Sequence, residues 1–439
     1  MERHAHPGEF LRYAWLNVMG MLGLSCYILA DTFFIARALG ADGLAALNLA
    51  LPVYSLVHGS GLMLGVGGAT RYSIFRGQGL PPGEERTFSH TLDLALALAG
   101  VCLCAGLFLS PAITALLGGR GAVGEMTRIY LQVILLFSPA FLLNDILLCY
   151  VRNDGSPRLA MAAMLTGSAS NVLLDYLFLF PLGMGIFGAV LATGLAALIS
   201  IAVLSPRLLR RPRPFRWVRE RRSGAMYLDL LALGVPSLVT EASSGIVIMA
   251  FNTIFLRLEG NTSVAAYGVV ANLSLVVSAI FTGLAQGGQP IISRAWGGGD
   301  FLRVRHTGAW ACAAALVLSA LLFSLLFLFA SPIAALFNSQ GDPALQRIAV
   351  EGIRLYFIGL PFVGLNTVLV MYFTSTQRPA PAQLLSLCRG FFLLLPAAVL
   401  LALAWGIPGV WLSYPLTEAL VTLLALFLRP GLLPLGKKR

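Results

Sequence analysis

The chain has 439 residues, of which 58% are hydrophobic and only 11% charged, and its mean hydropathy is +0.83. Soluble domains carry about a quarter charged residues, so this composition excludes a soluble fold and indicates an integral membrane protein. The net charge of +11 requires no nucleic-acid partner, because an excess of Lys and Arg in cytoplasmic loops is typical of membrane proteins.

Twelve apolar stretches of membrane-spanning length follow one another along the chain. A hydrocarbon core of about 30 Å is crossed by roughly 20 helical residues. We expect the spans at 10–36, 44–68, 88–114, 126–151, 158–180, 186–205, 228–256, 263–290, 306–328, 349–374, 380–404 and 408–428. The sequence therefore predicts an all-α integral membrane protein with twelve transmembrane helices.

The second half of the chain repeats the first at an offset of 220 to 222 positions. Ala-Asp-Thr-Phe-Phe around Asp31 is echoed by Phe-Asn-Thr-Ile-Phe around Asn252. Further matched pairs are Ala45-Ala46 with Ala265-Ala266, Gly67-Gly68 with Gly287-Gly288, Gly77 with Gly297, Asn144 with Asn366, Tyr150 with Tyr372, Pro157 with Pro379, and Gly188 with Gly409. Duplicated units are common in secondary transporters. Because each unit has an even number of spans, the two six-helix repeats are predicted to be parallel.

The repeat predicts an N-lobe over 1–205, a cytoplasmic Arg-rich linker over 206–227 and a C-lobe over 228–439. Most of the 30 Lys and Arg residues fall on the face shared by the N-terminus, the even-numbered loops and the C-terminus. Positive residues are retained in the cytoplasm, so we expect both termini there, in a multi-pass protein of a prokaryotic cytoplasmic (inner) membrane. Eight arginines between Arg207 and Arg222 are interpreted as an orientation signal and a contact for anionic headgroups.

Enzyme chemistry is not indicated. The six cysteines and five histidines show no metal-ligand spacing, and there is no nucleophile elbow or phosphate loop. His90 and Asp93 resemble an acyl-transfer pair, but a capping or interfacial role fits their place near a helix start better. We therefore predict no enzymatic activity and no organic cofactor.

Polar side chains inside the first-half spans are functional candidates, because a charge at the centre of a transmembrane helix costs at least about 2.5 kcal/mol. Asp31, Asp175 and Thr193 lie at similar depths near the outer ends of the first, fifth and sixth spans. Asn171 precedes Asp175 by one helical turn on the same face. Asp145, near the cytoplasmic end of the fourth span, is interpreted as part of a hydrogen-bonded gate or interface.

The group of Asp31, Asn171, Asp175 and Thr193 suits either of two coupling ions. Several oxygen ligands would bind Na⁺, whereas two nearby carboxylates cannot both stay ionised at low cost in a low dielectric and would share a proton. The alternative is that each aspartate only hydrogen-bonds a kinked helix.

The second half carries a different polar set, at positions Glu241, Asn252, Asn366, Arg389 and Glu418. Arg389 and Glu418 lie near mid-span and can form either a structural ion pair or part of a substrate path. Glu241 is interpreted as a contact for a cationic substrate.

With these residues in place, the chain resembles the multidrug and toxic compound extrusion (MATE) family over its full length. The order, spacing and repetition of several short segments carry the resemblance. They are Ala-Asp-Thr-Phe-Phe at 30–34, Arg152-Asn-Asp-Gly-Ser-Pro157, Asn171-Val-Leu-Leu-Asp175, Gly188-Ala-Val-Leu-Ala-Thr193, Glu241-Ala-Ser-Ser-Gly245 with Phe251-Asn252, and Gly283-Leu-Ala-Gln-Gly-Gly-Gln-Pro290.

The resemblance implies two six-helix lobes that open alternately and export small organic cations or drugs, driven by entry of H⁺ or Na⁺. It carries the family's N-lobe cation site over to Asp31, Asn171, Asp175 and Thr193. Some members also have an Asp in the tenth helix, but 356–372 holds no acid here and offers Asn366 and Thr367, which argues against a C-lobe cation site of that kind. A chain with both lobes is expected to work as a monomer in the bilayer.

Three other functions fit the sequence less well. A flippase for lipid-linked saccharides, from the same superfamily, would need a cationic cavity for pyrophosphate, whereas the intramembrane charge here is mainly acidic. A facilitator-type permease would carry an Asp-Arg-rich signature between spans two and three, and 71–86 lacks it. A membrane-embedded transferase would need a His/Asp or Cys/His constellation at one interface, which the sequence does not offer.

Overall fold

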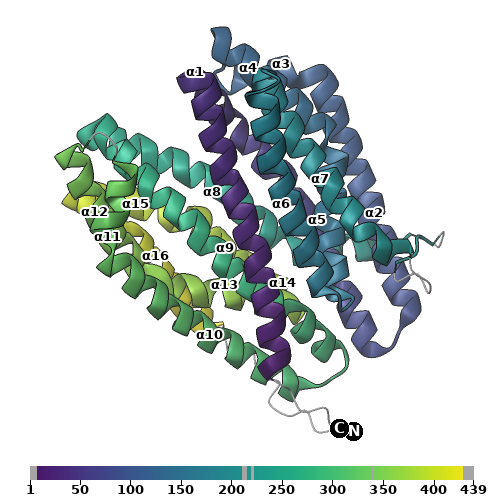
Figure 1. The fold of residues 1–439 in the computed structure, drawn as a ribbon. Coiled ribbons are helices and arrows are strands. Elements are labelled where there is room, and N and C mark those ends of the chain that lie inside the picture. The colour runs from purple at the N-terminus through teal and green to yellow at the C-terminus, as the bar shows by residue number, and fades with distance from the viewer. Residues whose placement is uncertain (1–6, 210–214, 219–221, 339–340, 429–439) are drawn as a thin grey trace.

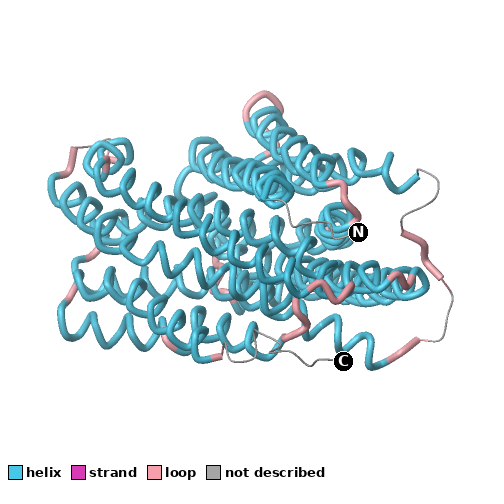
Figure 2. The backbone as a smooth tube through the Cα atoms, turned by 90° about the horizontal axis from the view of Figure 1, so that it is seen from below, coloured by secondary structure: helices cyan, strands magenta, loops and turns pink. Residues whose placement is uncertain are grey.

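The computed structural model describes residues 7–209, 215–218, 222–338 and 341–428, and its regular elements are all helical within these ranges (Figures 1 and 2). The first half contains α1 (Pro7–Gln78), α2 (Pro81–Cys104), η1 (Ala105–Leu109), α3 (Ser110–Leu116), α4 (Gly121–Leu136), α5 (Ser138–Asn153), α6 (Pro157–Leu179) and α7 (Gly185–Leu209). The second half contains α8 (Gly224–Glu259), α9 (Asn261–Gly297), α10 (Phe301–Leu328), α11 (Ala330–Phe337), α12 (Pro343–Tyr356), η2 (Phe357–Gly359), α13 (Leu360–Ser375), α14 (Pro379–Leu387), η3 (Cys388–Phe392), α15 (Leu394–Trp405) and α16 (Ile407–Phe427).

The described residues contain the twelve expected spans. Ten helical segments are long and apolar enough to cross a membrane, and the bent pair α4 and α5 brings the number to eleven. The twelfth comes from α1, which is broken at Gly40 and therefore contains both the first and the second predicted span. The all-helical, twelve-span prediction is confirmed.

The fourth span departs from the straight helix expected over 126–151. α4 and α5 meet at an angle of 51°, with Phe137 between them. Pro139 is at the start of α5, where it has no backbone N–H to continue the hydrogen-bond ladder of α4. The bend follows from that missing donor.

The internal repeat is visible in the backbone as well as in the sequence. Gly40 has φ 65° and ψ −151°, and Gly260 has φ 73° and ψ −153°. This conformation is essentially restricted to glycine. Gly185, the first residue of α7, and Gly406, directly before α16, also share positive φ values of 61° and 63°. The duplicated chain therefore turns between consecutive spans with the same unusual backbone in both halves.

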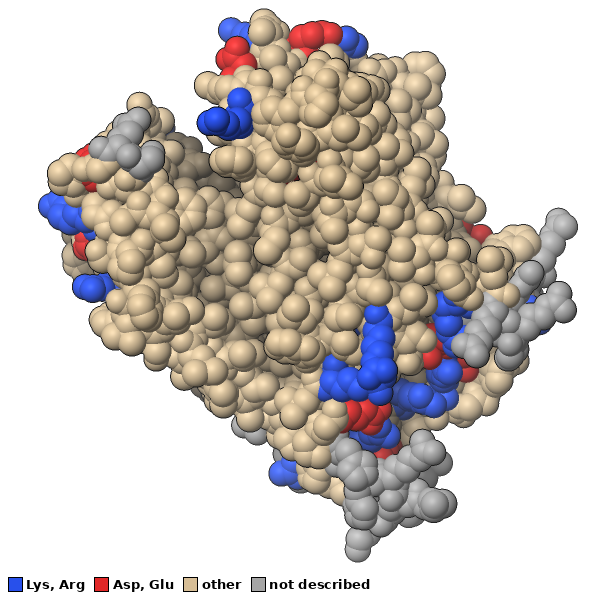
Figure 3. Space-filling model, in the orientation of Figure 1, with Lys and Arg blue, Asp and Glu red and all other residues tan. Residues whose placement is uncertain are grey.

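The helices form two lobes that touch at one end and separate at the other. Figure 1 shows the first-half helices on one side and the second-half helices on the other, spread apart away from the start of α1. At the end where the lobes separate, the surface between them is hollowed (Figure 3). The residue boundaries of the lobes, 1–205 and 228–439, remain predictions.

At the closed end, glycines let backbones from the two lobes approach each other. A Cβ on Gly77 would overlap the carbonyl oxygen of Arg294, and a Cβ on Gly297 would overlap that of Ile74. Ile74 and Arg294 are themselves separated by the repeat offset, so the two contacts are equivalent by pseudo-symmetry. Only glycine fits at both positions.

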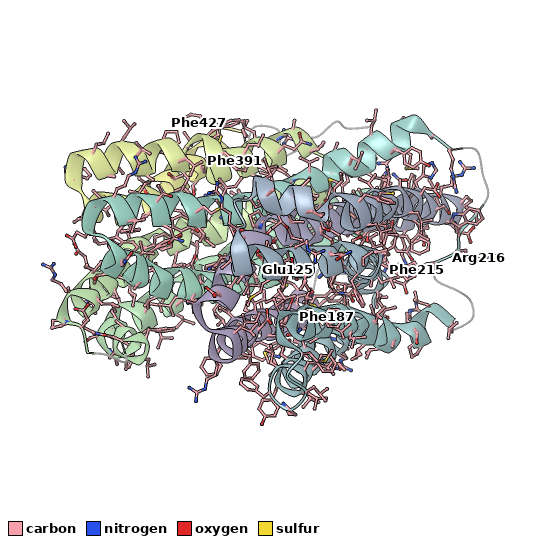
Figure 4. All side chains as sticks on the ribbon, turned by 90° about the horizontal axis from the view of Figure 1, so that it is seen from above. Glu125, Phe187, Phe215, Arg216, Phe391 and Phe427 are labelled. Atoms are coloured by element: carbon pink, nitrogen blue, oxygen red, sulfur yellow. The ribbon has the colours of Figure 1, made fainter. Side chains whose placement is uncertain are left out.

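Each lobe has its own aromatic core, and the outside is apolar. Phe255 and Trp411 are fully buried in the C-lobe with ring centroids 4.5 Å apart. On the outside, Leu116 is 87% exposed and Phe427 is 80% exposed, and Phe427 points away from the neighbouring helices (Figure 4). Exposed side chains of this kind match a multi-pass protein whose surrounding solvent is lipid.

The described part of the predicted linker is attached to the N-lobe. Phe215 is buried among N-lobe aromatic rings, while Arg216 points outward (Figure 4). The Ser223 N–H donates to His90 Nε2 at 3.1 Å, and Arg222 Nε lies 2.7 Å from Asp93 Oδ2. His90 and Asp93 therefore hold the linker, consistent with the interfacial role expected for them. Linker positions 210–214 and 219–221 lie outside the described residues.

Candidate functional site

The four N-lobe candidates come from three helices and meet inside the lobe. Asp31 lies on the first half of α1, Asn171 and Asp175 lie one turn apart on α6, and Thr193 lies on α7. All four are buried, and Asn171 and Asp175 have 0% exposure. The structure therefore brings together the residues that depth alone had grouped.

The two carboxyl groups of this site face each other without a compensating donor. Asp31 and Asp175 are close enough to interact directly through their side chains. Within the described residues, Asp31 Oδ1, Asn171 Oδ1 and both carboxylate oxygens of Asp175 receive no hydrogen bond. Buried acceptors in this state are costly, so the site is built to take a proton or a cation.

The amide and hydroxyl of the site are oriented by short contacts. Asn171 Nδ2 donates to Thr193 Oγ1 at 3.4 Å, and Thr193 Oγ1 donates to the carbonyl of Ala189 at 3.2 Å. The Asn171 side-chain oxygen is thereby left as an acceptor. Such a set of carboxylate, amide and hydroxyl oxygens fits a hard cation such as Na⁺, and a proton shared by the two carboxyls fits equally.

Two tyrosines that the sequence does not single out lie beside the carboxyl pair, and a third contacts one of them. Tyr27 and Tyr130 lie close enough to interact electrostatically with Asp31. The Tyr27 and Tyr54 hydroxyls are 3.1 Å apart. Tyr27 precedes Asp31 by four residues, and that helical spacing is the signal that could have revealed it.

A small cavity extends from Asn171 and Thr193 to His58 and Asp145. Its volume is about 70 Å³, and it is lined by α1, α5, α6 and α7. Asn171 and Thr193 line it together with Tyr54 and His58. The unpartnered Oδ1 of Asn144 lies on a lining residue as well. Unsatisfied polar atoms in a space of this size are satisfied by water.

His58, the one histidine of the expected span 44–68, pairs with Asp145. The His58 Nδ1 atom lies 3.0 Å from Asp145 Oδ2, and Glu241 of α8 is near enough to interact with both side chains. Glu241 thus lies beside the His58–Asp145 pair, and its interpretation as a contact for a cationic substrate stays a prediction. His58 could have been identified as a candidate from the sequence, because it is an ionisable residue within an apolar span.

The remaining C-lobe residues form a closed and neutral network. Arg389 Nε donates to Glu418 Oε1 and Oε2 at 2.9 Å and 3.0 Å. Asn366 Nδ2 donates to Glu418 Oε2 at 2.7 Å, and Thr422 Oγ1 donates to Asn366 Oδ1 at 3.0 Å. Asn252 lies half-buried on α8 and makes no hydrogen bond to this network among the described residues. The arrangement favours a structural ion pair over a substrate contact.

A further hydrogen-bonded layer joins the two lobes at the closed end. Arg152 is buried and donates to Asn17 Oδ1 at 2.9 Å and to Gln286 Oε1 at 2.7 Å. Next to it, Asn153 Nδ2 donates to Gln289 Oε1 at 2.9 Å. Asp145, expected in a hydrogen-bonded gate or interface, bonds to His58, and this second interlobe layer lies at Arg152, seven residues further along α5.

A protein-family model described as MatE matches two separate stretches of the chain, residues 18–177 and 236–400. One stretch falls in each predicted lobe.

Two curated relatives align along almost the whole chain. The "Multidrug export protein MepA" of Staphylococcus saprophyticus is 22% identical over 415 residues, covering 94% of this chain and 90% of that protein. The "FAD transporter" of Shewanella oneidensis is 24% identical over 428 residues, covering 94% of this chain and 92% of that protein.

Solved structures share the fold. One described as "Crystal structure of MATE in complex with MaL6" has a TM-score of 0.91 at 21% identity, covering 97% of this chain and 96% of that chain. Another, "Outward-facing conformation of a multidrug resistance MATE family transporter of the MOP superfamily", has a TM-score of 0.90 at 22% identity with the same coverage. These likenesses extend over both lobes of the twelve-helix fold.

Proposed function

The chain belongs to the MatE family, and from that premise we propose that it is a secondary active multidrug efflux transporter. It exports small organic cations in exchange for entering H⁺ or Na⁺, by alternating access between the two lobes. It is a transporter and not an enzyme, and its only cofactor is the coupling ion. The name of the MepA relative, a multidrug export protein, supports this cargo class.

The single observation that carries the proposal is the buried, uncompensated carboxyl pair of Asp31 and Asp175. Asp31 Oδ1 and both carboxyl oxygens of Asp175 have no donor within the described residues, so an ion that neutralises the pair stabilises the site. Binding of H⁺ or Na⁺ there, together with Asn171 and Thr193, changes the packing of the first half of α1. The ion is thereby linked to the position of a helix that begins at the lobe contact.

Coupling follows if ion and cargo bias one equilibrium in opposite directions. With both termini in the cytoplasm, the hollow between the lobes opens outward, and the ion enters from that side. Ion binding favours release of the cargo, and the emptied, charged site favours cargo loading from the cytoplasm. We place the protein in the prokaryotic cytoplasmic membrane and expect one chain to complete this cycle.

The acidic character of the lobe boundary supports a cationic cargo. Glu241 has no basic partner other than His58 among the described residues, whereas Arg389 is neutralised by Glu418. A flippase for lipid-linked saccharides is the alternative, and it would need free positive charge for pyrophosphate. One relative is named an FAD transporter, so an anionic dinucleotide is a competing cargo class. If the cargo is cationic, FAD should not be exported.

The proposal is tested by Asp31→Asn in cells that lack their own efflux pumps. Ethidium efflux is expected to fall at least tenfold, roughly the effect of a lost interaction worth about 1.4 kcal/mol or more, because an amide cannot hold the proton or charge. Asp42→Asn, an exposed aspartate beyond the Gly40 break, is the matched control and should retain efflux. Full ethidium efflux by Asp31→Asn, at equal expression, would sink the assignment.

A further inference from the structure

A second group of ionisable side chains lies apart from Asp31 and Asp175, at the boundary between the lobes. It consists of His58 on α1, Asp145 on α5 and Glu241 on α8. Within the described residues it does not form a metal-binding group. One imidazole between two carboxyl groups is instead a place for a proton and for a positive charge that replaces it.

Two glycines of α1 shape this group. A Cβ on Gly61 would overlap Asp145 Oδ2, and a Cβ on Gly59 would lie 2.9 Å from the Cβ of Glu241. The two glycines follow His58 by one and three positions. They let both acidic residues approach the same stretch of α1, so the contact depends on backbone positions without side chains.

The imidazole has one committed nitrogen and one available nitrogen. Nδ1 is engaged with Asp145 Oδ2 at 3.0 Å, and the hydrogen bonds of the described residues leave Nε2 without a partner. The Tyr54 ring stacks on His58 with an interplanar angle of 6°. The His58 side chain is 19% exposed, so water reaches it and Nε2 can exchange a proton.

The groups that face His58 are few. Tyr54 comes from α1, Asp145 from α5 and Glu241 from α8. The faces of α6 and α7 that line the adjoining cavity contribute no ionisable side chain. Protonation of Nε2 is therefore governed by two carboxyl groups and by whatever cation enters between the lobes.

The cavity gives the proton a route. It runs from His58 past Tyr54 to Asn171 and Thr193, and the Tyr54 hydroxyl lies 3.1 Å from that of Tyr27. Unpartnered polar atoms on its lining residues provide hydrogen bonds for water. A proton lost from His58 can therefore enter water inside the N-lobe without crossing lipid.

We propose that the His58–Asp145 pair is a second proton-binding site, and that it releases its proton when a cationic cargo reaches Glu241. The inference rests on the proposed function and adds to it a site at the lobe boundary. The proton leaves Nε2 of the imidazolium for cavity water, while Nδ1–H keeps its bond to Asp145. The cargo cation replaces the lost positive charge beside the two carboxylates, so the net charge of the group is conserved. Two cations close together in a low dielectric repel, and this repulsion drives the exchange.

The test measures ethidium binding by fluorescence anisotropy to the purified full chain in detergent. Kd is followed between about pH 5 and 10, a range wide enough for a histidine that lies beside carboxylates. If one proton leaves for each cation bound, affinity rises with pH by up to about tenfold per pH unit from this site. In His58→Asn, the amide keeps a donor near the position of Nδ1 but cannot be protonated, so the slope of log Kd against pH falls by up to about one.

Controls separate this site from the coupling pair. His306→Asn, an exposed histidine on α10, should keep the wild-type slope. The loss caused by His58→Asn should also persist in an Asp31→Asn background, because the two sites hold separate protons. Asp145→Asn removes the charge that retains the proton, so it should reduce the slope as His58→Asn does. It replaces His58→Asn in the test if that variant is not monodisperse.

Two outcomes overturn the inference and are distinguishable. If His58→Asn and Asp145→Asn keep the wild-type slope while ethidium efflux is intact, the inference is wrong and the proposed function stands. If the wild-type chain neither binds nor exports ethidium at any pH, both fail together.

Discussion

Single residues show where the protein needs an ion and where it does not. Asp175 has two carboxylate oxygens that receive no hydrogen bond among the described residues. Glu418 is just as buried, but it accepts from Arg389 at 2.9 Å and from Asn366 at 2.7 Å. A carboxylate that is already satisfied gains little from a proton or cation, whereas an unsatisfied one depends on it. Sequence depth found both residues but not this difference, because partners depend on which way each helix face points.

The Arg389–Glu418 pair is therefore expected to matter for stability. Glu418→Gln leaves a buried guanidinium without its counter-charge, which destabilises a folded protein by about 3 to 5 kcal/mol. Thermal unfolding of the purified protein in detergent should show a clearly lower Tm. Glu259→Gln, at the exposed end of α8, is the control and should change Tm little. An unchanged Tm for Glu418→Gln would mean that the pair does not stabilise the C-lobe.

At the scale of helices, the sequence predicted span positions well because each span is an apolar run of characteristic length. Repeated glycines also marked real turns, since Gly40 and Gly260 share a backbone that other residues rarely adopt. The bend between α4 and α5 was missed although Pro139 was visible. The proximity of Glu241 to His58 and Asp145 could not be predicted, because the hydrophobic pattern gives the depth of a residue along its helix and not how that helix is rotated against the other lobe.

The glycine contacts between lobes give a prediction about helices. In Gly297→Ala the new methyl group overlaps the Ile74 carbonyl. The two lobes should therefore separate at the closed end and let water in between them. Cys149, which is 2% exposed and lies beside Arg152, should react faster with a water-soluble maleimide, followed site by site by mass spectrometry. Gly268→Ala, whose methyl would meet nothing within 4 Å, is the control. Equal labelling of Cys149 in both variants would contradict tight closure there.

The whole molecule is a duplicated scaffold with unequal chemistry. Both halves keep the same turns and the same lobe contact, yet Asp31 is matched by Asn252, and Asp145 by Thr367. Uncompensated acid thus collects in the first half and at the boundary, while the second half holds a neutral network. We infer that the N-lobe binds the ion and that the C-lobe shapes the cargo path. The family and fold could be predicted from sequence because order and repetition survive at low identity.

The central claim is that an ion entering at Asp31 and Asp175 drives export of a cation. The most direct measurement is ethidium flux into inside-out vesicles under an imposed pH gradient and, separately, an imposed Na⁺ gradient. We predict that at least one gradient drives uptake by the wild-type chain and that neither does so for Asp31→Asn or Asp175→Asn. Gradient-driven uptake by both variants at the wild-type rate would contradict the account.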